Sequence, residues 1–158
     1  MKMKKIIAAI LCGLLLLSLA ACGGGEKSGD TMSAEEILNG LYEGAGKDEL
    51  PMGLMTVQAE GEMFEYFFFI PEVAGAEAWV SEPGISSIAH SVGVIRLPED
   101  ADAEDIAAQI EANMNPSKWL CVTAEKAEVI CHGQTILLVM SSYELADLVI
   151  ANFDALWE

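Results

Sequence analysis

The sequence predicts an α+β domain in which a mainly antiparallel sheet packs against about three helices. The patterns follow the order helix, strands, helix, strands, helix, without the regular strand–helix alternation that indicates a parallel sheet. Gly133 lies between two apolar runs and predicts an antiparallel hairpin. We expect a single domain at residues 31–158, because a chain of this length buries one core of ordinary size but not two.

The first half of this domain begins with a helix. Ser33 and Glu36 have the spacing of a capping box, and the helix is expected to end at the glycines near residue 44. The aromatic residues 63–70 predict a strand, and residues 77–81 predict a second one. Pro83 and Gly84 fit a type II turn, in which the glycine supplies the positive φ.

The longest strand pattern covers residues 88–97 and is expected at the centre of the sheet. Its alternation places His90, Val92 and Val94 on one face. The other face carries small residues, including Ser91 and Gly93. These small residues allow a helix to pack closely against that face.

The second half is expected to hold two helices and three strands. Asp100 or Asp102 caps a helix that ends before Pro116. Strands are expected at residues 119–123, 129–132 and 135–140, and the last is apolar on both faces, which predicts an interior strand. Gly133 joins the last two strands as a type II′ turn. A second capping box, beginning at Ser141, precedes the final helix.

Residues 1–21 have the features of a lipoprotein signal peptide. Three lysines precede an apolar run at residues 6–21, which as a helix measures about 24 Å and is shorter than a hydrocarbon core of about 30 Å. Residues 19–22, Leu-Ala-Ala-Cys, match a bacterial lipobox, so we expect cleavage before Cys22 and acylation of this cysteine. An ordinary secretory signal and an uncleaved anchor are the alternatives.

The lipid, diacylglycerol and palmitate on Cys22, is expected to hold the protein on the extracytoplasmic face of the cell membrane. Two or three acyl chains anchor stably, whereas one binds marginally. Residues 22–30 are expected to form a flexible linker with a reach of roughly 16 Å. Residues 22–158 contain 25 acidic and five basic residues, a net charge of −20. This charge excludes nucleic acid and anionic lipid surfaces as partners.

Three local patterns occur together in the domain. The first is Ser81-Glu82-Pro83 followed by residues 87–92, the second is residues 115–122, and the third is the Gly133 hairpin with its apolar strand. Together they resemble a family of small lipoproteins from Gram-positive bacteria that carry a domain of unknown function. The resemblance implies a lipobox, a tether and one α+β domain, and it implies no activity or catalytic residues.

Cys121 and Cys131 are the two cysteines of the domain. If residues 124–128 connect two antiparallel strands, Cys121 lies opposite Cys131, and an exported protein can join them in a disulfide. Two buried free thiols are the alternative, which an anaerobic host favours. A redox-active pair is disfavoured, because neither a Cys-x-x-Cys motif nor a helix N-terminus accompanies these cysteines.

We expect no metal and no cofactor. A zinc site from Cys121, Cys131, His132 and a carboxylate lacks the spaced ligand pairs of structural zinc sites, and His132 is expected to be solvated at its turn. The carboxylates of residues 100–111 have the spacing of a calcium loop. However, Asp105 stands where that loop needs glycine, and the start of a helix explains these carboxylates better.

A binding role is favoured over catalysis, because neither Gly-x-Ser-x-Gly nor His-Glu-x-x-His occurs. His90, Trp79 and Trp119, with the aromatic residues 66–69, are the candidate binding residues. Their default interpretation is a hydrogen-bonded histidine and core aromatics. We expect an envelope module that binds a protein or a small ligand. The alternatives are an envelope enzyme, such as a hydrolase using His90, and an accessory subunit of a membrane complex.

Overall fold

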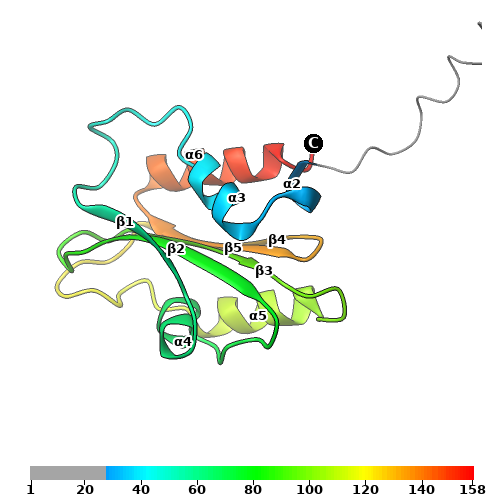
Figure 1. Ribbon diagram of the computed structural model, residues 1–158. Coiled ribbons are helices and arrows are strands. Elements are labelled where there is room, and N and C mark those ends of the chain that lie inside the picture. Colours follow the sequence, from blue (N-terminus) through cyan, green and yellow to red (C-terminus); the bar gives the residue numbers. More distant parts are fainter. Residues whose placement is uncertain (1–27) are drawn as a thin grey trace, which may run out of the picture.

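The computed structural model describes residues 28–158, which form a five-stranded antiparallel sheet with helices on both faces (Figure 1). The predicted α+β class is confirmed. The predicted signal peptide and the lipidation site Cys22 lie outside the described residues. Within the described part of the chain, no helix has the length and apolar character needed to cross a membrane.

The sheet has the strand order β1-β2-β3-β5-β4. Its strands are β1 (Leu54–Gln58), β2 (Glu77–Pro83), β3 (Ser91–Arg96), β4 (Lys126–His132) and β5 (Thr135–Ser141). The helices are α2 (Ser28–Thr31), α3 (Ala34–Gly40), α4 (Glu62–Phe68), α5 (Ala103–Asn113) and α6 (Tyr143–Ala155). Figure 1 shows α2, α3 and α6 on one side of the sheet and α4 and α5 on the other.

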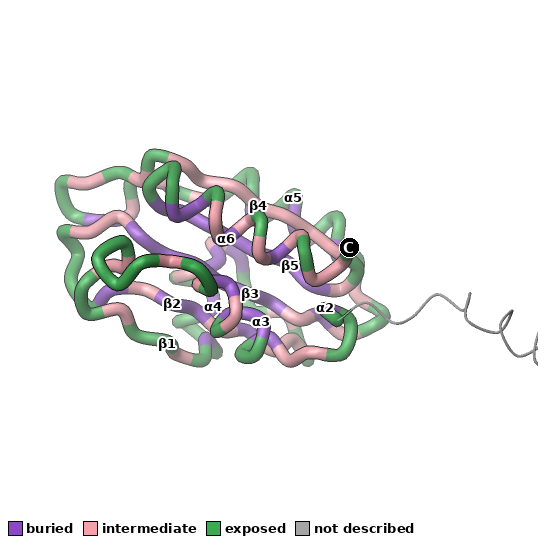
Figure 2. The backbone as a smooth tube through the Cα atoms, turned by 90° about the horizontal axis from the view of Figure 1, so that it is seen from above, coloured by how far each residue is buried: buried purple, intermediate pink, exposed green. Residues whose placement is uncertain are grey.

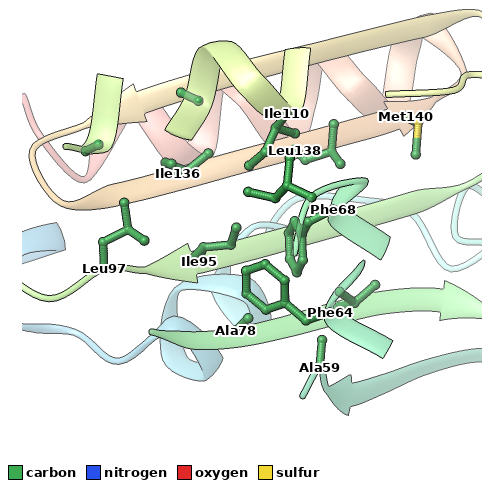
Figure 3. Packing of buried hydrophobic residues seen from close by; sticks show 14 of the residues in the cluster. Ala59, Phe64, Phe68, Ala78, Ile95, Leu97, Ile110, Ile136, Leu138 and Met140 are labelled. Carbon is green, nitrogen blue, oxygen red and sulfur yellow. The ribbon is translucent and has the colours of Figure 1, made fainter. Parts of the chain in front are cut away.

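The central strand and its neighbour have the predicted positions, although β3 has six residues and is shorter than the predicted strand at residues 88–97. β3 lies in the middle of the sheet, and β5 beside it is buried at every residue. Gly93 of β3 faces α4, where an added Cβ atom would lie 2.6 Å from a ring carbon of Phe68. Figure 3 shows the Phe68 ring reaching from α4 toward these strands. The absence of a side chain at Gly93 therefore lets α4 approach the sheet closely.

Two hydrophobic cores form, one on each face of the sheet, because successive residues of a strand point to opposite faces. On the α4 and α5 side, the core includes Phe64, Phe68, Ile95, Ile110 and Leu138 (Figure 3). On the α3 and α6 side, it includes Ile37, Leu38, Val94, Val139 and Phe153.

Several local signals are confirmed. Ser33 caps α3 in a complete capping box with Glu36. The side chain of Asp102 caps α5 by accepting from the backbone of Asp105. In the β4–β5 hairpin His132 pairs with Thr135, and Gly133 has a φ of 55°, as a type II′ turn requires.

The aromatic residues 63–70 were predicted as a strand, but residues 63–68 instead belong to α4, which ends at Phe68. Aromatic residues favour strands only because such side chains pack well on a sheet surface. Here Phe64 and Phe68 are four residues apart, so they share one helix face and their ring centroids lie 4.9 Å apart. Packing of this face on the sheet outweighs the local preference. The edge strand β1 lies in a stretch for which the sequence predicts no regular structure.

Residues 119–123 were also predicted as a strand and instead belong to a loop at residues 114–125. Cys121 has a φ of 66° there, which no strand residue adopts. Cys131 lies in β4 opposite Ile136, so the pairing that would join the two cysteines is absent. The possible disulfide is therefore contradicted, and both cysteines are free thiols. Cys121 is exposed and Cys131 is partly buried, so neither has the fully buried position of the alternative.

Two further predictions are corrected at turns. Pro83 is the last residue of β2, and Gly84 has no positive φ, so the predicted type II turn is wrong. The cap of α6 is Ser142, which accepts from the backbone of Leu145, and not Ser141.

The domain begins earlier than predicted, because Ser28–Thr31 forms the short helix α2 in place of the last residues of the linker. The Arg96 side chain donates to the carbonyl oxygens of Gly29 and Asp30. The Trp157 indole donates to the Asp30 carboxylate at 3.0 Å. These contacts fix the start of the domain beside its C-terminal end (Figure 1).

Candidate functional site

A cavity of about 340 Å³ opens at the end of the sheet where β1 begins and β2 ends. β1 contributes Met55 and Val57, and α4 contributes Met63, Tyr66 and Phe67. Residues 82–86 and 118–119 complete the wall. Figure 1 shows that the β2–β3 loop and the loop at residues 114–125 meet at this end, away from α2. We call this cavity the β1 pocket.

A buried ion pair lies in the β1 pocket. The ammonium of Lys118 is 2.6 Å from the Glu82 carboxylate, and the two side chains are 5% and 14% exposed. Lys118 also donates to the Ser91 hydroxyl at 3.3 Å, and the Trp119 indole donates to Glu82 at 3.2 Å. These bonds hold both charges in place, as burial of an ion pair requires.

Aromatic rings surround the Lys118 ammonium. Its nitrogen lies 4.7 Å from the ring centroid of Phe67, 4.9 Å from that of Tyr66 and 5.3 Å from that of Trp119. Each distance is within the range of a cation–π interaction. The Lys118 ammonium therefore brings together aromatic rings from α4 and from the loop at residues 114–125.

Burial shifts the pKa values of Lys118 and Tyr66 in the pocket. It lowers the pKa of Lys118, although the hydrogen bond and charge of Glu82 act in the opposite direction. Burial, and to a lesser degree the Glu82 charge, raise the pKa of Tyr66. The Tyr66 hydroxyl is neutral at physiological pH, as an ordinary tyrosine is, and can both donate and accept a hydrogen bond.

The rim of the pocket is apolar and exposed. Among the described residues, seven large apolar or aromatic side chains are exposed, and four of them line this pocket. They are Met55, Met63, Tyr66 and Ile85. Methionine side chains are flexible and adapt to irregular surfaces. The rim can therefore fit apolar groups of more than one shape.

Two of the predicted aromatic groups meet here and one does not. Trp119, Tyr66 and Phe67 come together around Lys118, whereas Phe68 packs over Gly93 in the core. Trp79 packs with the α3 and α6 core on the opposite face, where its indole donates to Glu77 at 3.1 Å. A period-two alternation places Trp79 and Glu82 on opposite faces of β2, which explains the separation.

His90 does not line the pocket either. It is 1% exposed, and its ring nitrogens lie 2.9 Å from the Tyr42 hydroxyl and 2.8 Å from the Ser141 hydroxyl. Burial lowers the pKa of His90 to about 4. His90 is thus the hydrogen-bonded core histidine that the sequence favours.

His132 is only partly solvated, with its side chain 34% exposed. Its ring stacks on Phe153 and on Trp157, with centroid distances of 5.4 and 5.1 Å, and its Nε2 atom lies 2.8 Å from Asp154. Within residues 28–158, no group of three or more histidine, cysteine or acidic side chains is arranged to hold a metal ion.

A larger hollow, of about 520 Å³, lies between residues 48–49 and the start of α6. Its polar residues, Asp48, Glu49, Ser142 and Glu144, are all exposed. It has neither a buried polar group nor an aromatic wall. The β1 pocket is therefore the stronger candidate for a site.

Sequence reasoning missed the polar half of the β1 pocket. Lys118 and Glu82 are 36 positions apart, and no local pattern pairs them. One feature of the sequence could have drawn attention to Lys118, which is that basic residues are scarce. Lys118 is one of four basic residues at positions 28–158, and an aromatic residue follows it directly.

No protein-family model matches this sequence, and neither a curated protein nor a solved structure matches it significantly. The function must therefore be argued from the geometry of the chain.

Proposed function

We propose that this protein is a lipid-anchored, non-catalytic binding module on the extracytoplasmic face of the cell membrane, and that the β1 pocket binds its ligand. The observation that carries this proposal is the exposed apolar rim around the buried Lys118–Glu82 pair. Ligand pockets typically combine apolar and aromatic walls with a few fixed polar groups. The ligand therefore presents an apolar or aromatic group to the rim.

The chemistry of the pocket favours binding over catalysis. Lys118 and Glu82 neutralise each other and are held by further hydrogen bonds. Neither group is poised to exchange a proton with a substrate. The alternative, a hydrolase using His90, needs that ring to reach a substrate, but it is 1% exposed and bonded at both nitrogens.

The position of the pocket suits a tethered receptor. The linker joins the domain at α2, beside the beginning of β2, since Arg96 donates to the carbonyl oxygens of Gly29 and Asp30 and pairs with Glu77 in the sheet. The pocket lies at the other end of β2, whose seven residues span about 20 Å. An anchor on Cys22 therefore attaches to the end of the domain opposite the pocket.

A thermal-shift screen tests the binding role. The sample is the chain from residue 22, with Cys22→Ser to prevent acylation, and the probes are metals, sugars, peptides and metabolites. A ligand at a hundred times its Kd is expected to stabilise the fold by about 2.7 kcal/mol. Tyr66→Ala is expected to abolish this stabilisation and Tyr143→Ala to preserve it, because both tyrosines are exposed but only Tyr66 lines the pocket. Equal responses from both variants would place the ligand elsewhere.

Membrane fractionation tests the anchor. Cys22→Ala is expected to move the protein from the membrane to the soluble fraction, and its mass is expected to lack the acyl groups. An unchanged mass and an unchanged membrane fraction would rule out the lipobox. Co-purification of the Cys22→Ala variant with an integral membrane protein would instead favour the accessory-subunit hypothesis.

A further inference from the structure

We propose that the ligand of the β1 pocket is an extended segment of a partner protein, rich in basic and apolar residues, which pairs with the free edge of β1 as a sixth strand. One apolar side chain of that segment enters the pocket. This inference rests on the proposed binding function and specifies the class of ligand.

The outer edge of β1 is available for pairing. Among the described strands, β1 pairs only with β2. The backbone of Ala59 donates to Ala78, and that of Gly84 donates to Gly53. Antiparallel hydrogen bonding alternates along a strand. Leu54, Thr56 and Gln58 therefore direct their backbone N–H and C=O groups away from β2.

Nothing in the sequence of β1 protects this edge. Natural edge strands are blocked by charged side chains, proline or a bulge. β1 reads Leu-Met-Thr-Val-Gln, without charge or proline, and its register with β2 is continuous over five pairs. Met55, Thr56 and Gln58 are exposed, and Figure 2 shows β1 at the margin of the molecule.

The free edge and the pocket are adjacent. Met55 and Val57 belong to β1 and also line the pocket, so their side chains lie on its side of the sheet. An added strand lies about 4.8 Å from β1 and places every second side chain beside them. Main-chain bonds then supply affinity, and the pocket selects one side chain, as in β-strand addition.

Charge determines which segment fits. Residues 28–158 contain 24 acidic and four basic residues, a net charge of −20. Glu60, Glu62 and Glu65 are exposed just beyond the C-terminal end of β1. A segment with lysine or arginine at one end is attracted to this region. A second copy of the chain carries the same charge and is repelled.

A selection from a displayed library of random twelve-residue peptides tests the proposal. The target is the chain from residue 22 with Cys22→Ser. We expect enriched sequences to alternate apolar and polar residues and to carry a basic end. The enriched peptides are then synthesised with N-methylated backbone amides at either the odd or the even positions. We expect methylation of one of these two sets to weaken binding at least tenfold, and methylation of the other set to have little effect.

A variant of the protein provides the matched test. Thr56→Pro removes an outward N–H group but no bond to β2, and it is expected to weaken peptide binding at least tenfold. Tyr143→Ala is expected to have no effect. If Thr56→Pro does not fold, the N-methylated peptides still test the proposal with the unsubstituted protein.

Three results would overturn the proposal. They are a selection without enrichment, peptides that bind equally well after N-methylation of either set, and a dimer of this chain that Thr56→Pro dissociates. If small apolar molecules bind the pocket in the thermal-shift screen while no peptide is enriched, strand addition fails and the proposed binding function stands.

Discussion

The two edge strands of the sheet differ in how they meet solvent. β1 carries no charged residue, whereas β4 carries Lys126 and Glu128. Lys126 lies 3.0 Å from the carboxylate of Glu128 and 2.8 Å from that of Asp147 on α6. His132 lies 2.8 Å from Asp154, also on α6. Charged groups therefore block the β4 edge and leave the β1 edge open.

The difference shows where this acidic chain places its few basic residues. Arg96 holds the start of the domain, and Lys126 protects the β4 edge. Lys118 instead points inward beside β1 and orders the pocket. An open edge beside an ordered pocket is the arrangement that a peptide-binding surface needs, whereas an open edge alone is a site of aggregation.

The largest expected effect is on the free energy of unfolding, when Lys118 beside β1 and Lys126 on β4 are replaced in turn. Lys118→Met leaves the Glu82 carboxylate buried without its partner, and removal of one member of a buried pair costs roughly 3–5 kcal/mol. Lys126→Met breaks exposed ion pairs and is expected to change the free energy of unfolding much less. Urea denaturation measures both variants. Similar losses would mean that the Lys118–Glu82 pair has no special role.

Acid is expected to weaken the centre of the sheet, where His90 precedes β3. Its pKa falls from 6.5 to about 4 on folding, so the unfolded state binds the proton first as the pH decreases. The neutral histidine is favoured above pH 6.5, and about 3 kcal/mol of stability is lost between pH 6.5 and 4. His90→Gln is expected to remove this part of the pH dependence. Parallel pH profiles for both proteins would contradict the assignment.

Gly93 and Gly84 differ in how easily the neighbouring side chain can move. Gly93→Ala places a methyl group 2.6 Å from Phe68 in the packed core and is expected to cost about 1–3 kcal/mol. Gly84→Ala meets the mobile end of Met55 at 3.1 Å, which can move aside, so a smaller change is expected. Thermal unfolding compares the two variants. An equal cost at Gly84 would show that the pocket rim is rigid.

The smallest expected effect on folding comes from adding a charged side chain to the β1 edge and removing one from the β4 edge. Thr56→Lys adds a charge to β1, where we expect a change in unfolding free energy within about 0.5 kcal/mol. The same change is expected to reduce aggregation on heating. Glu128→Thr, which removes a charge from β4, is expected to increase it. Light scattering during a temperature ramp measures both, and identical curves would mean that the edges do not differ.

The sequence predicted those elements whose signals are local. The capping box at Ser33, the Gly133 turn and the apolar strand β5 each depend on residues within a few positions of one another. The central position of β3 and the close approach of a helix to Gly93 followed from one alternating pattern.

The errors have one physical cause, which is that long-range packing decided between local alternatives. The aromatic stretch folds as α4 (Glu62–Phe68) because Phe68 fits over Gly93, a residue 25 positions away. Cys121 adopts a positive φ in a loop where Trp119 is buried against the core. The pocket could not be derived from the sequence, because it requires both the placement of α4 and the pairing of Lys118 with Glu82.

Site-specific photo-crosslinking in intact cells tests the central claim most directly. A photoreactive phenylalanine analogue replaces Tyr66 in one strain and Tyr143 in another, two tyrosines that are 56% and 62% exposed. We predict a discrete adduct from position 66 and none from position 143, with loss of the adduct in a Thr56→Pro background. Adducts of equal yield from both positions, or from position 143 alone, would contradict a binding surface at the β1 edge.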